Sequence, residues 1–172
     1  MEVWDLYDEN KQLTGKSCVR GEQIQDDYYH LVVHVWIKND KGEYLIAQRS
    51  EKKETDPLKW ECVGGSVLKG ENSLQGAIRE TKEEVGIDLN EADGKLVYSN
   101  TRKVMNGKKF NDIMDAWLFI YNGEVDLKKA TTDEVKDIKW VKREEIFKLL
   151  ESKDFVQTLD YFFDEIDKTV KV

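Results

Sequence analysis

Cysteine is scarce in this chain. The 172 residues include two cysteines, Cys18 and Cys62, which form no repeated spacing. A framework of several disulfides needs more cysteines, and so does a structural zinc site built from cysteine and histidine ligands. We therefore expect the fold to be stabilised by its hydrophobic core, without disulfides or structural metal.

Long apolar runs are absent as well. No stretch approaches the roughly 20 apolar residues that cross a membrane as a helix, and the first residues do not resemble a signal peptide. Both absences are typical of a cytoplasmic protein. We expect that location, with no membrane partner.

Positive charge is in deficit. The chain has 27 lysines and arginines against 35 aspartates and glutamates, which gives a formal net charge of −8 at pH 7. Such a chain repels nucleic acids and anionic membranes, so we expect no non-specific binding to nucleic acid. A small phosphate ligand would need a local cation, for which a bound metal ion is suited.

The length of the chain fits one domain. A chain of 172 residues can bury a sizeable core, but it has no room for a second full domain. We expect a single domain over residues 1–172, in which residues 1–27 form a short β-rich arm. Residues 153–172 predict a closing amphipathic helix, because four apolar residues recur at helical spacing. These residues are Phe155, Leu159, Phe162 and Ile166.

Acidic residues and glycines concentrate between Gly65 and Ile87, in the stretch GSVLKGENSLQGAIRETKEEVGI. The pattern predicts a loop, a helix and a loop. Asn72 can cap the helix, with Gln75 reaching back to complete a capping box, and Gly86 suits a left-handed residue at the end. The helix is therefore expected to begin after Asn72 and to end before Gly86.

One face of this expected helix is acidic. At roughly 100° per residue, Glu80, Glu83 and Glu84 fall within an arc of about 100°. The opposite side carries an apolar stripe made by Leu74, Ala77, Ile78 and Val85.

Two interpretations of the acidic face are open. It could be an ordinary solvated face, in which Arg79 supports Glu83 at a spacing of four residues. Alternatively, a hard divalent cation could turn the crowded carboxylates into a binding site, since such ions prefer oxygen ligands. The surrounding residues favour the second interpretation. Gly64 and Gly65 allow backbone to approach a ligand closely, and Glu71 is a potential ion-pair partner of Arg79.

The stretch resembles the Nudix box, G-x5-E-x7-R-E-U-x-E-E-x-G-U, in which U is an apolar residue. Thr81 departs from the pattern at the first U, where its hydroxyl could bond back to the Ala77 carbonyl. No metal ligand is lost by this substitution. The matching positions are Gly65, Glu71, Arg79, Glu80, Glu83, Glu84, Gly86 and Ile87.

The resemblance implies a metal-dependent hydrolase of diphosphates. It implies Mg²⁺, or Mn²⁺ in its place, held by Glu80, Glu83, Glu84 and the carbonyl oxygen of Gly65. Arg79 then acts in support together with Glu71. Catalysis is expected to involve Glu83, Glu84 and Arg79 of the box and a general base.

The general base is less certain from the sequence, because the family often supplies it from a loop before a late strand. Glu134, in TTDEVKDIKWV, is the first candidate. Glu84 is the second. Asp115 is a distant third, since an acid inside an apolar strand is either solvated or turned toward the metal pocket.

The remaining pattern predicts strands on both sides of the box helix. The strand around His30 to Ile37 is apolar on both faces and is expected to be central, with His30 and His34 interpreted as sheet histidines rather than metal ligands. Such an order suits a mixed sheet covered by helices on both sides. Resemblance to the Nudix family implies this α/β/α sandwich more firmly. The other predicted strands are residues 43–49, 59–63, 95–101, 110–121 and 135–141, with a helix at 143–150.

Three functions are compatible with the resemblance. The first is a hydrolase that cleaves a nucleoside diphosphate derivative or a related organic diphosphate. The second is an enzyme like isopentenyl diphosphate isomerase, but that branch has a cysteine just before the box glycine, where this chain has Gly64. The third is a Nudix domain that binds without turnover, which the complete set of box glutamates disfavours. By analogy alone, a homodimer that uses the N-terminal arm is compatible with the family.

Overall fold

A mixed seven-stranded sheet forms the centre of the computed structural model, which describes residues 1–105 and 107–168. Its main path runs β5-β4-β3-β8-β7, while β6 pairs with β3 and β9 pairs with β4. The pairing of β3 with β8 is parallel and the other pairings are antiparallel. The strands are β3 (His30–Lys38), β4 (Tyr44–Arg49), β5 (Trp60–Glu61), β6 (Val63–Ser66), β7 (Lys95–Met105), β8 (Lys108–Ile120) and β9 (Val135–Val141).

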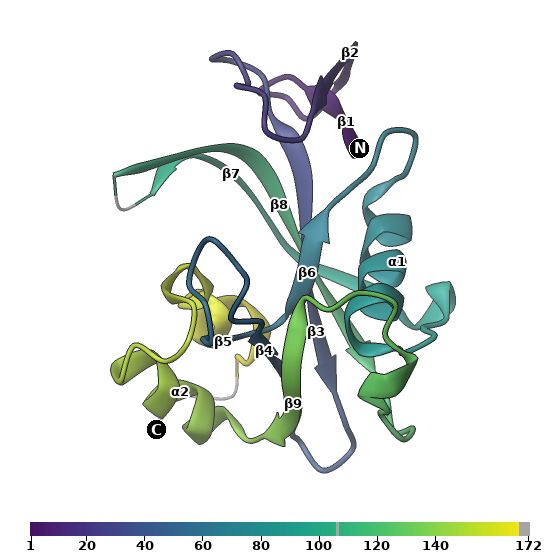
Figure 1. The fold of residues 1–172 in the computed structure, drawn as a ribbon, viewed down its shortest axis with the longest axis vertical. Coiled ribbons are helices and arrows are strands. Elements are labelled where there is room, and N and C mark those ends of the chain that lie inside the picture. The colour runs from purple at the N-terminus through teal and green to yellow at the C-terminus, as the bar shows by residue number, and fades with distance from the viewer. Residues whose placement is uncertain (106, 169–172) are drawn as a thin grey trace.

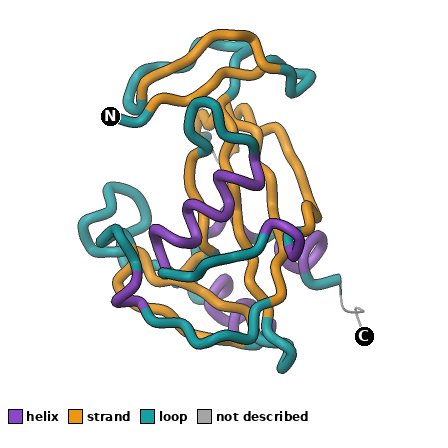
Figure 2. Tube along the Cα trace, turned by 90° about the vertical axis from the view of Figure 1, so that its right-hand side faces the viewer, coloured by secondary structure: helices purple, strands orange, loops and turns teal. Residues whose placement is uncertain are grey.

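Helices cover both faces of this sheet. The box helix α1 (Ser73–Val85) lies across one face, and α2 (Arg143–Glu151) lies with the C-terminal segment on the other (Figures 1 and 2). Short 3-10 turns form η1 (Glu91–Asp93) and η2 (Leu127–Lys129). This α/β fold with a mixed sheet confirms the predicted fold class.

Strand β3 is central because both of its faces are apolar. Leu31 and Val33 belong to the core cluster beneath α1, whereas Trp36 is fully buried in a second cluster beneath α2 and the C-terminal segment. Alternate residues of a strand face opposite sides of the sheet, so one strand serves both cores. The parallel register with β8 then brings Val33 opposite Asp115, and the antiparallel register with β6 brings it opposite Gly65.

The N-terminal arm forms a separate two-stranded hairpin, β1 (Val3–Tyr7) and β2 (Leu13–Val19), above the sheet (Figure 1). Its contacts reach the box loop, because the Lys69 amide donates to the Val3 carbonyl at 2.8 Å and the Gly70 amide donates to Asp5 Oδ2 at 2.8 Å. The predicted β-rich arm is thus present, and it holds the loop that precedes α1.

The predicted helix over residues 153–172 is wrong in its described part. Lys153 has a φ of 64°, and the chain then pairs with β5: the Trp60 amide donates to Asp154 and the Val156 amide donates to Trp60. Extended pairing of this kind is incompatible with a helix, so only a 3-10 turn, η3 (Gln157–Leu159), and a π turn, η4 (Phe162–Ile166), follow. The four apolar residues of the predicted stripe are nevertheless all buried. Residues 169–172 lie outside the described part of the chain.

Candidate active site

Helix α1 begins and ends as its sequence predicts. The Gln75 amide donates to Asn72 Oδ1 at 2.9 Å, and the Asn72 amide donates to Gln75 Oε1 at 2.9 Å, which is a complete capping box. Gly86 ends the helix with a φ of 72°. Inside the helix, the Thr81 hydroxyl donates to the Ala77 carbonyl at 2.8 Å, so this departure from the box pattern is buried and hydrogen-bonded. These bonds set the rotation and ends of the acidic face.

Arg79 is the centre of an ion-pair network on that face. Its guanidinium donates to Glu71 at 2.8 Å, to Glu80 at 2.9 Å, to Glu83 at 3.0 Å and to the carbonyl of Ser66 at 2.8 Å. Burial alone would lower the pKa of Arg79, but the hydrogen bonds and charges of Glu71 and Glu80 raise it above its usual range. Arg79 therefore stays charged and ties the box loop to the helix.

Glu84 points away from Arg79, toward the sheet. Its carboxyl is buried and accepts a hydrogen bond from the Gly64 amide at 3.2 Å. Burial raises the pKa of Glu84 well above its usual range, and the charges of Glu61 and Glu80 raise it further. Burial thus disfavours the charged form of this carboxyl, and a cation beside it would oppose that effect.

Glu80 lies against the backbone of the residue that opens the box. A Cβ placed on Gly65 would come within 2.4 Å of the Glu80 carboxyl carbon, so only glycine leaves room for this carboxyl. Burial raises the pKa of Glu80 to about 7, although Arg79 opposes the shift; Glu83 and Glu134 add to it. The helix thus presents one buried and one partly buried carboxyl group at the edge of β6.

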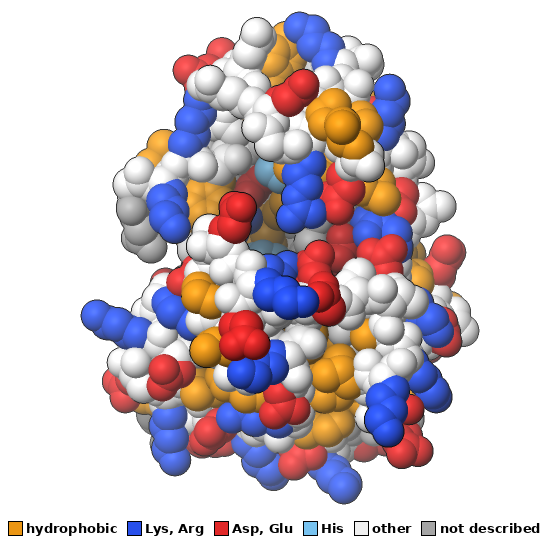
Figure 3. Space-filling view, viewed as in Figure 1, with side chains coloured by type: hydrophobic (Ala, Val, Ile, Leu, Met, Phe, Trp, Pro, Cys, Tyr) orange, Lys and Arg blue, Asp and Glu red, His pale blue; other side chains and the backbone are white. Residues whose placement is uncertain are grey.

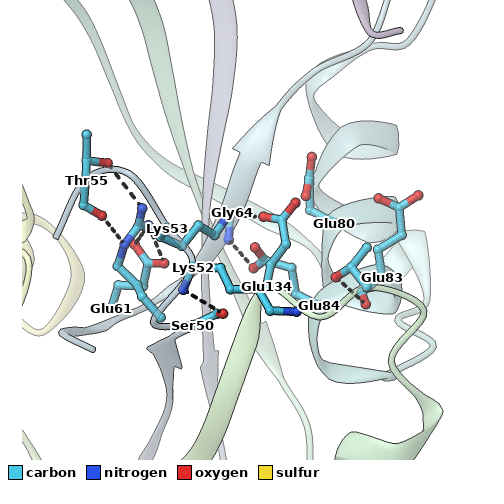
Figure 4. A network of polar contacts seen from close by, with 12 residues as sticks. Ser50, Lys52, Lys53, Thr55, Glu61, Gly64, Glu80, Glu83, Glu84 and Glu134 are labelled. Carbon is cyan, nitrogen blue, oxygen red and sulfur yellow. Dashed lines mark hydrogen bonds and ion pairs between the residues drawn. The ribbon is translucent and has the colours of Figure 1, made fainter. Parts of the chain in front are cut away.

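Glu134 reaches the same region from the loop before β9. Its carboxylate forms an ion pair with Lys53, and its carbonyl accepts a hydrogen bond from the Ser50 amide at 2.8 Å. Figure 4 shows the Glu134 side chain between Lys53 and Glu80. The loop over residues 50–56 therefore contributes a lysine to the site, which sequence reasoning missed. No local spacing could reveal it, because the two partners are 81 positions apart.

The oxygen ligands suit a hard divalent cation such as Mg²⁺ or Mn²⁺. A cation beside Glu80 and Glu84 would oppose the rise that burial causes in the pKa of both carboxyl groups. Within residues 1–105 and 107–168, however, no three acidic, histidine or cysteine side chains are already grouped as metal ligands. The reason is that Glu80 and Glu83 are turned toward Arg79. The residues fit the ion by their chemistry, and their side chains must rotate to bind it.

Asp115 is buried, so the alternative in which this acid is solvated is wrong. Its Oδ1 accepts a hydrogen bond from Ser99 at 2.6 Å, while Ser99 in turn accepts one from Lys11 at 2.6 Å. Its charge also acts on Tyr7 of the N-terminal hairpin. Among the described residues, no hydrogen bond or ion pair joins Asp115 to a box glutamate, which weakens it as a general base.

His34 lies in the sheet on the side opposite α1. Its Nδ1 is 2.8 Å from the Tyr161 hydroxyl, which also accepts a hydrogen bond from Trp36 Nε1 at 3.1 Å. Burial, together with a smaller effect of the Arg102 charge, lowers the pKa of His34 to about 3. The imidazole is therefore neutral, with Nδ1 free to accept the tyrosine proton.

A cavity of about 580 Å³ opens beside the box strand. It reaches from Gly64 and Gly65 across His34 to the far end of the β7–β8 ribbon, and the loop over residues 50–56 closes one side. Figure 3 shows the hollow between the end of this ribbon and the body below. Its volume suits a small organic molecule. Because the cavity meets the box at Gly65, a ligand within it can lie next to the carboxylates of α1.

Comparison with known proteins gives consistent matches. The NUDIX domain model matches residues 28–164. An uncharacterized Nudix hydrolase of Listeria innocua is 39% identical over 164 residues, which is 95% of this chain and 91% of that protein. The chloroplastic isopentenyl-diphosphate Delta-isomerase 1 of Cannabis sativa is 32% identical over 171 residues, covering 87% of this chain and 58% of that protein.

Among solved structures, DR0079 from Deinococcus radiodurans superposes with a TM-score of 0.70 at 18% identity. The match covers 88% of this chain and 90% of that one. At this identity the likeness concerns the fold alone. Separately, no helix within the described part of the chain is long and apolar enough to cross a membrane.

Proposed function

This chain belongs to the NUDIX domain family, and on that premise we propose that it is a metal-dependent hydrolase that cleaves the diphosphate linkage of a nucleoside diphosphate derivative or a related organic diphosphate. The observation that carries the proposal is the placement of Glu80 and Glu84. The Glu84 carboxyl is buried beside Gly64, and the partly buried Glu80 carboxyl lies against Gly65, where the cavity begins. Burial raises the pKa of both carboxyl groups, and a bound divalent cation would oppose that rise.

The metal ligands in this proposal are Glu80, Glu83, Glu84 and the carbonyl oxygen of Gly65. A bound Mg²⁺ or Mn²⁺ supplies neutralisation of phosphate oxygens and a lowered pKa for the water that attacks phosphorus. Arg79 has a different task. Because it also donates to Glu71 and to the Ser66 carbonyl, it keeps the box loop tied to α1 when the side chains of Glu80 and Glu83 turn to the metal.

Glu134 is the general base that we propose. Its carboxylate comes from a loop outside the box and lies between Lys53 and Glu80 (Figure 4). A carboxylate that is not needed as a metal ligand can accept the proton of the attacking water. Lys53 holds it by an ion pair and limits its freedom. Glu84 is the alternative base.

An isomerase function is favoured only by the similarity to isopentenyl-diphosphate Delta-isomerase. The backbone opposes it at one position. A Cβ on Gly64 would lie 2.2 Å from the Val33 carbonyl oxygen, so a cysteine side chain cannot be placed there without moving β3 or β6. Cys62 lines the cavity but is buried, and burial raises the pKa of its thiol well above the usual range. The hydrolase remains the better supported proposal.

The test is an assay of the purified protein with Mg²⁺ and a panel of organic diphosphates. Phosphate-containing products should form, and Glu83→Gln should reduce their rate by about 100-fold or more. The matched control is Glu91→Gln, an exposed acid of η1 that should leave the rate unchanged. Conversion of isopentenyl to dimethylallyl diphosphate would establish the isomerase instead. Tight binding of a diphosphate without turnover would establish a binding domain.

A further inference from the structure

The cavity is cationic although the chain is acidic. The formal net charge of the whole chain is −8, yet more basic than acidic side chains line the cavity. Figure 3 shows Lys and Arg side chains around the hollow. The basic lining residues are Arg49, Arg102, Lys108 and Lys109, and the acidic ones are Asp56 and Glu61. A local excess of positive charge in an acidic protein selects for an anionic ligand.

Both arginines of the lining are already neutralised. Arg49 donates twice to Glu61, at 2.8 and 2.9 Å, between β4 and β5. Arg102 donates to both oxygens of Asp112 at 2.7 Å, and this pair is buried between β7 and β8. Bidentate pairs of this kind fix strands and leave little net charge for a ligand. The positive charge available to a ligand therefore comes from the lysines at the end of the ribbon.

Lys108 is the lysine with no competing contact. Its ammonium has no hydrogen-bond or ion-pair partner within residues 1–105 and 107–168, whereas Lys109 is paired with Asp26. The charge of Lys108 acts on Asp56, in the loop on another side of the cavity: Lys59 chiefly lowers the pKa of Asp56, and Arg49 and Lys108 lower it further. Lys108 and Asp56 are therefore near enough for their charges to interact.

Phe110 follows Lys108 by two positions in β8. Both line the cavity, and the Arg102 guanidinium lies 4.8 Å from the centre of the Phe110 ring. This end of the cavity therefore combines a flat aromatic surface with a free ammonium group. The box carboxylates are at the other end, next to Gly65.

We infer that the substrate of this enzyme carries a second anionic group, a phosphate or a carboxylate, on the organic moiety beyond its diphosphate, and that Lys108 binds that group while Phe110 contacts the moiety itself. The inference rests on the proposed function, since the diphosphate is taken to lie at the box. Lys108 is in this view a specificity-determining residue. Its contact lies far from the bond that breaks, so it acts on binding rather than on the chemical step.

The test uses pairs of organic diphosphates that differ by one phosphate monoester, coenzyme A with dephospho-coenzyme A and NADP⁺ with NAD⁺. Dissociation constants are measured by titration calorimetry with Mg²⁺ on a Glu134→Gln background, which keeps the proposed metal ligands but lacks the proposed general base. The phosphorylated member of at least one pair should bind roughly fivefold more tightly or better, as expected for one charge-assisted contact. Lys108→Ala should abolish that preference, and so should high salt.

Lys95→Ala is the matched control, because this exposed lysine begins β7 at the opposite end of the same ribbon. It should keep the preference. Equal affinities within both pairs would overturn the inference, and so would a preference that survives Lys108→Ala. The hydrolase activity is tested separately, by the Mg²⁺ assay of product formation. If that activity were absent, the affinities measured for the two pairs of ligands would not change for that reason.

Discussion

Gly65 and the Glu80 carboxyl are in such close contact that a methyl group on Gly65 would clash with the carboxyl. A Cβ on Gly65 would lie 2.4 Å from the carboxyl carbon of Glu80 and 2.5 Å from its Oε1. The Glu80 carboxyl is the free end of a flexible side chain, so Gly65→Ala should displace it rather than unfold the protein. We expect the stabilisation of the protein by Mg²⁺ to be largely lost, and kcat/KM to fall by about 10- to 100-fold.

A double-mutant cycle tests whether Gly65 acts through Glu80. Thermal unfolding with and without Mg²⁺ is measured for Gly65→Ala, Glu80→Gln and the double variant. If the alanine works by moving Glu80, it should have little further effect once Glu80 is replaced. Independent effects that add in the double variant would contradict this explanation.

Glu134 and Asp115 can be distinguished by their kinetics. Glu134→Gln should lower kcat by about 100- to 10,000-fold, as loss of a general base does, while the Mg²⁺ dependence of the rate stays unchanged. Asp115→Asn should leave kcat nearly unchanged, because Asp115 is bonded to Ser99 and faces the N-terminal hairpin. Steady-state rates at varied Mg²⁺ decide between them, and a large loss of kcat in Asp115→Asn with normal Glu134→Gln would reverse the assignment.

Arg79 should resist even a conservative replacement. Its planar guanidinium donates to three carboxylates and to the Ser66 carbonyl, a geometry that a lysine ammonium cannot reproduce. Arg79→Lys should therefore lower the free energy of unfolding by about 1–3 kcal/mol in urea denaturation at pH 7. Arg20→Lys is the control, since Arg20 forms one exposed pair with Glu2 and should change stability by less than about 0.5 kcal/mol. Equal effects of the two substitutions would contradict the network role of Arg79.

Local sequence was sufficient to predict α1, because its capping box, its C-terminal glycine and the Thr81 hydrogen bond join residues at most four positions apart. Such interactions are visible in spacing. The acidic face was predictable for the same reason, though the direction of each carboxyl was not: Glu83 turns to Arg79 while Glu84 turns to Gly64. That choice depends on the packing of α1 against β6.

Contacts between distant segments account for what the sequence did not predict. The apolar spacing around Phe155 indicated a helix, but backbone bonds to Trp60 impose an extended conformation there, and the side chains are buried all the same. Likewise, the pairing of Arg102 with Asp112 follows from the register of β7 and β8. Hydrophobic periodicity predicts which side chains are buried. It predicts the backbone conformation only where no neighbouring strand offers the backbone other hydrogen bonds.

The stability of the protein should fall in mild acid because of His34. Burial holds the pKa of His34 at about 3 in the folded state, against about 6.5 in the unfolded chain. Below pH 6.5 the unfolded chain therefore binds a proton at His34, whereas the folded chain does not. The contribution of the neutral imidazole to the free energy of unfolding is lost as the pH falls toward 3. Between pH 7 and pH 5 the loss should be about 2 kcal/mol.

Urea denaturation at pH 7, 6 and 5 measures this effect in the wild type and in His34→Gln. Glutamine cannot take up a proton in this range, and its carbonyl can still accept the hydrogen bond that Tyr161 donates. His30, the other histidine, is present in both proteins; burial chiefly lowers its pKa too, so its share cancels in the comparison. The variant should lose less stability than the wild type over the same range. An equal loss in both would mean that His34 can be protonated within the fold, and that its bond to Tyr161 does not require the neutral ring.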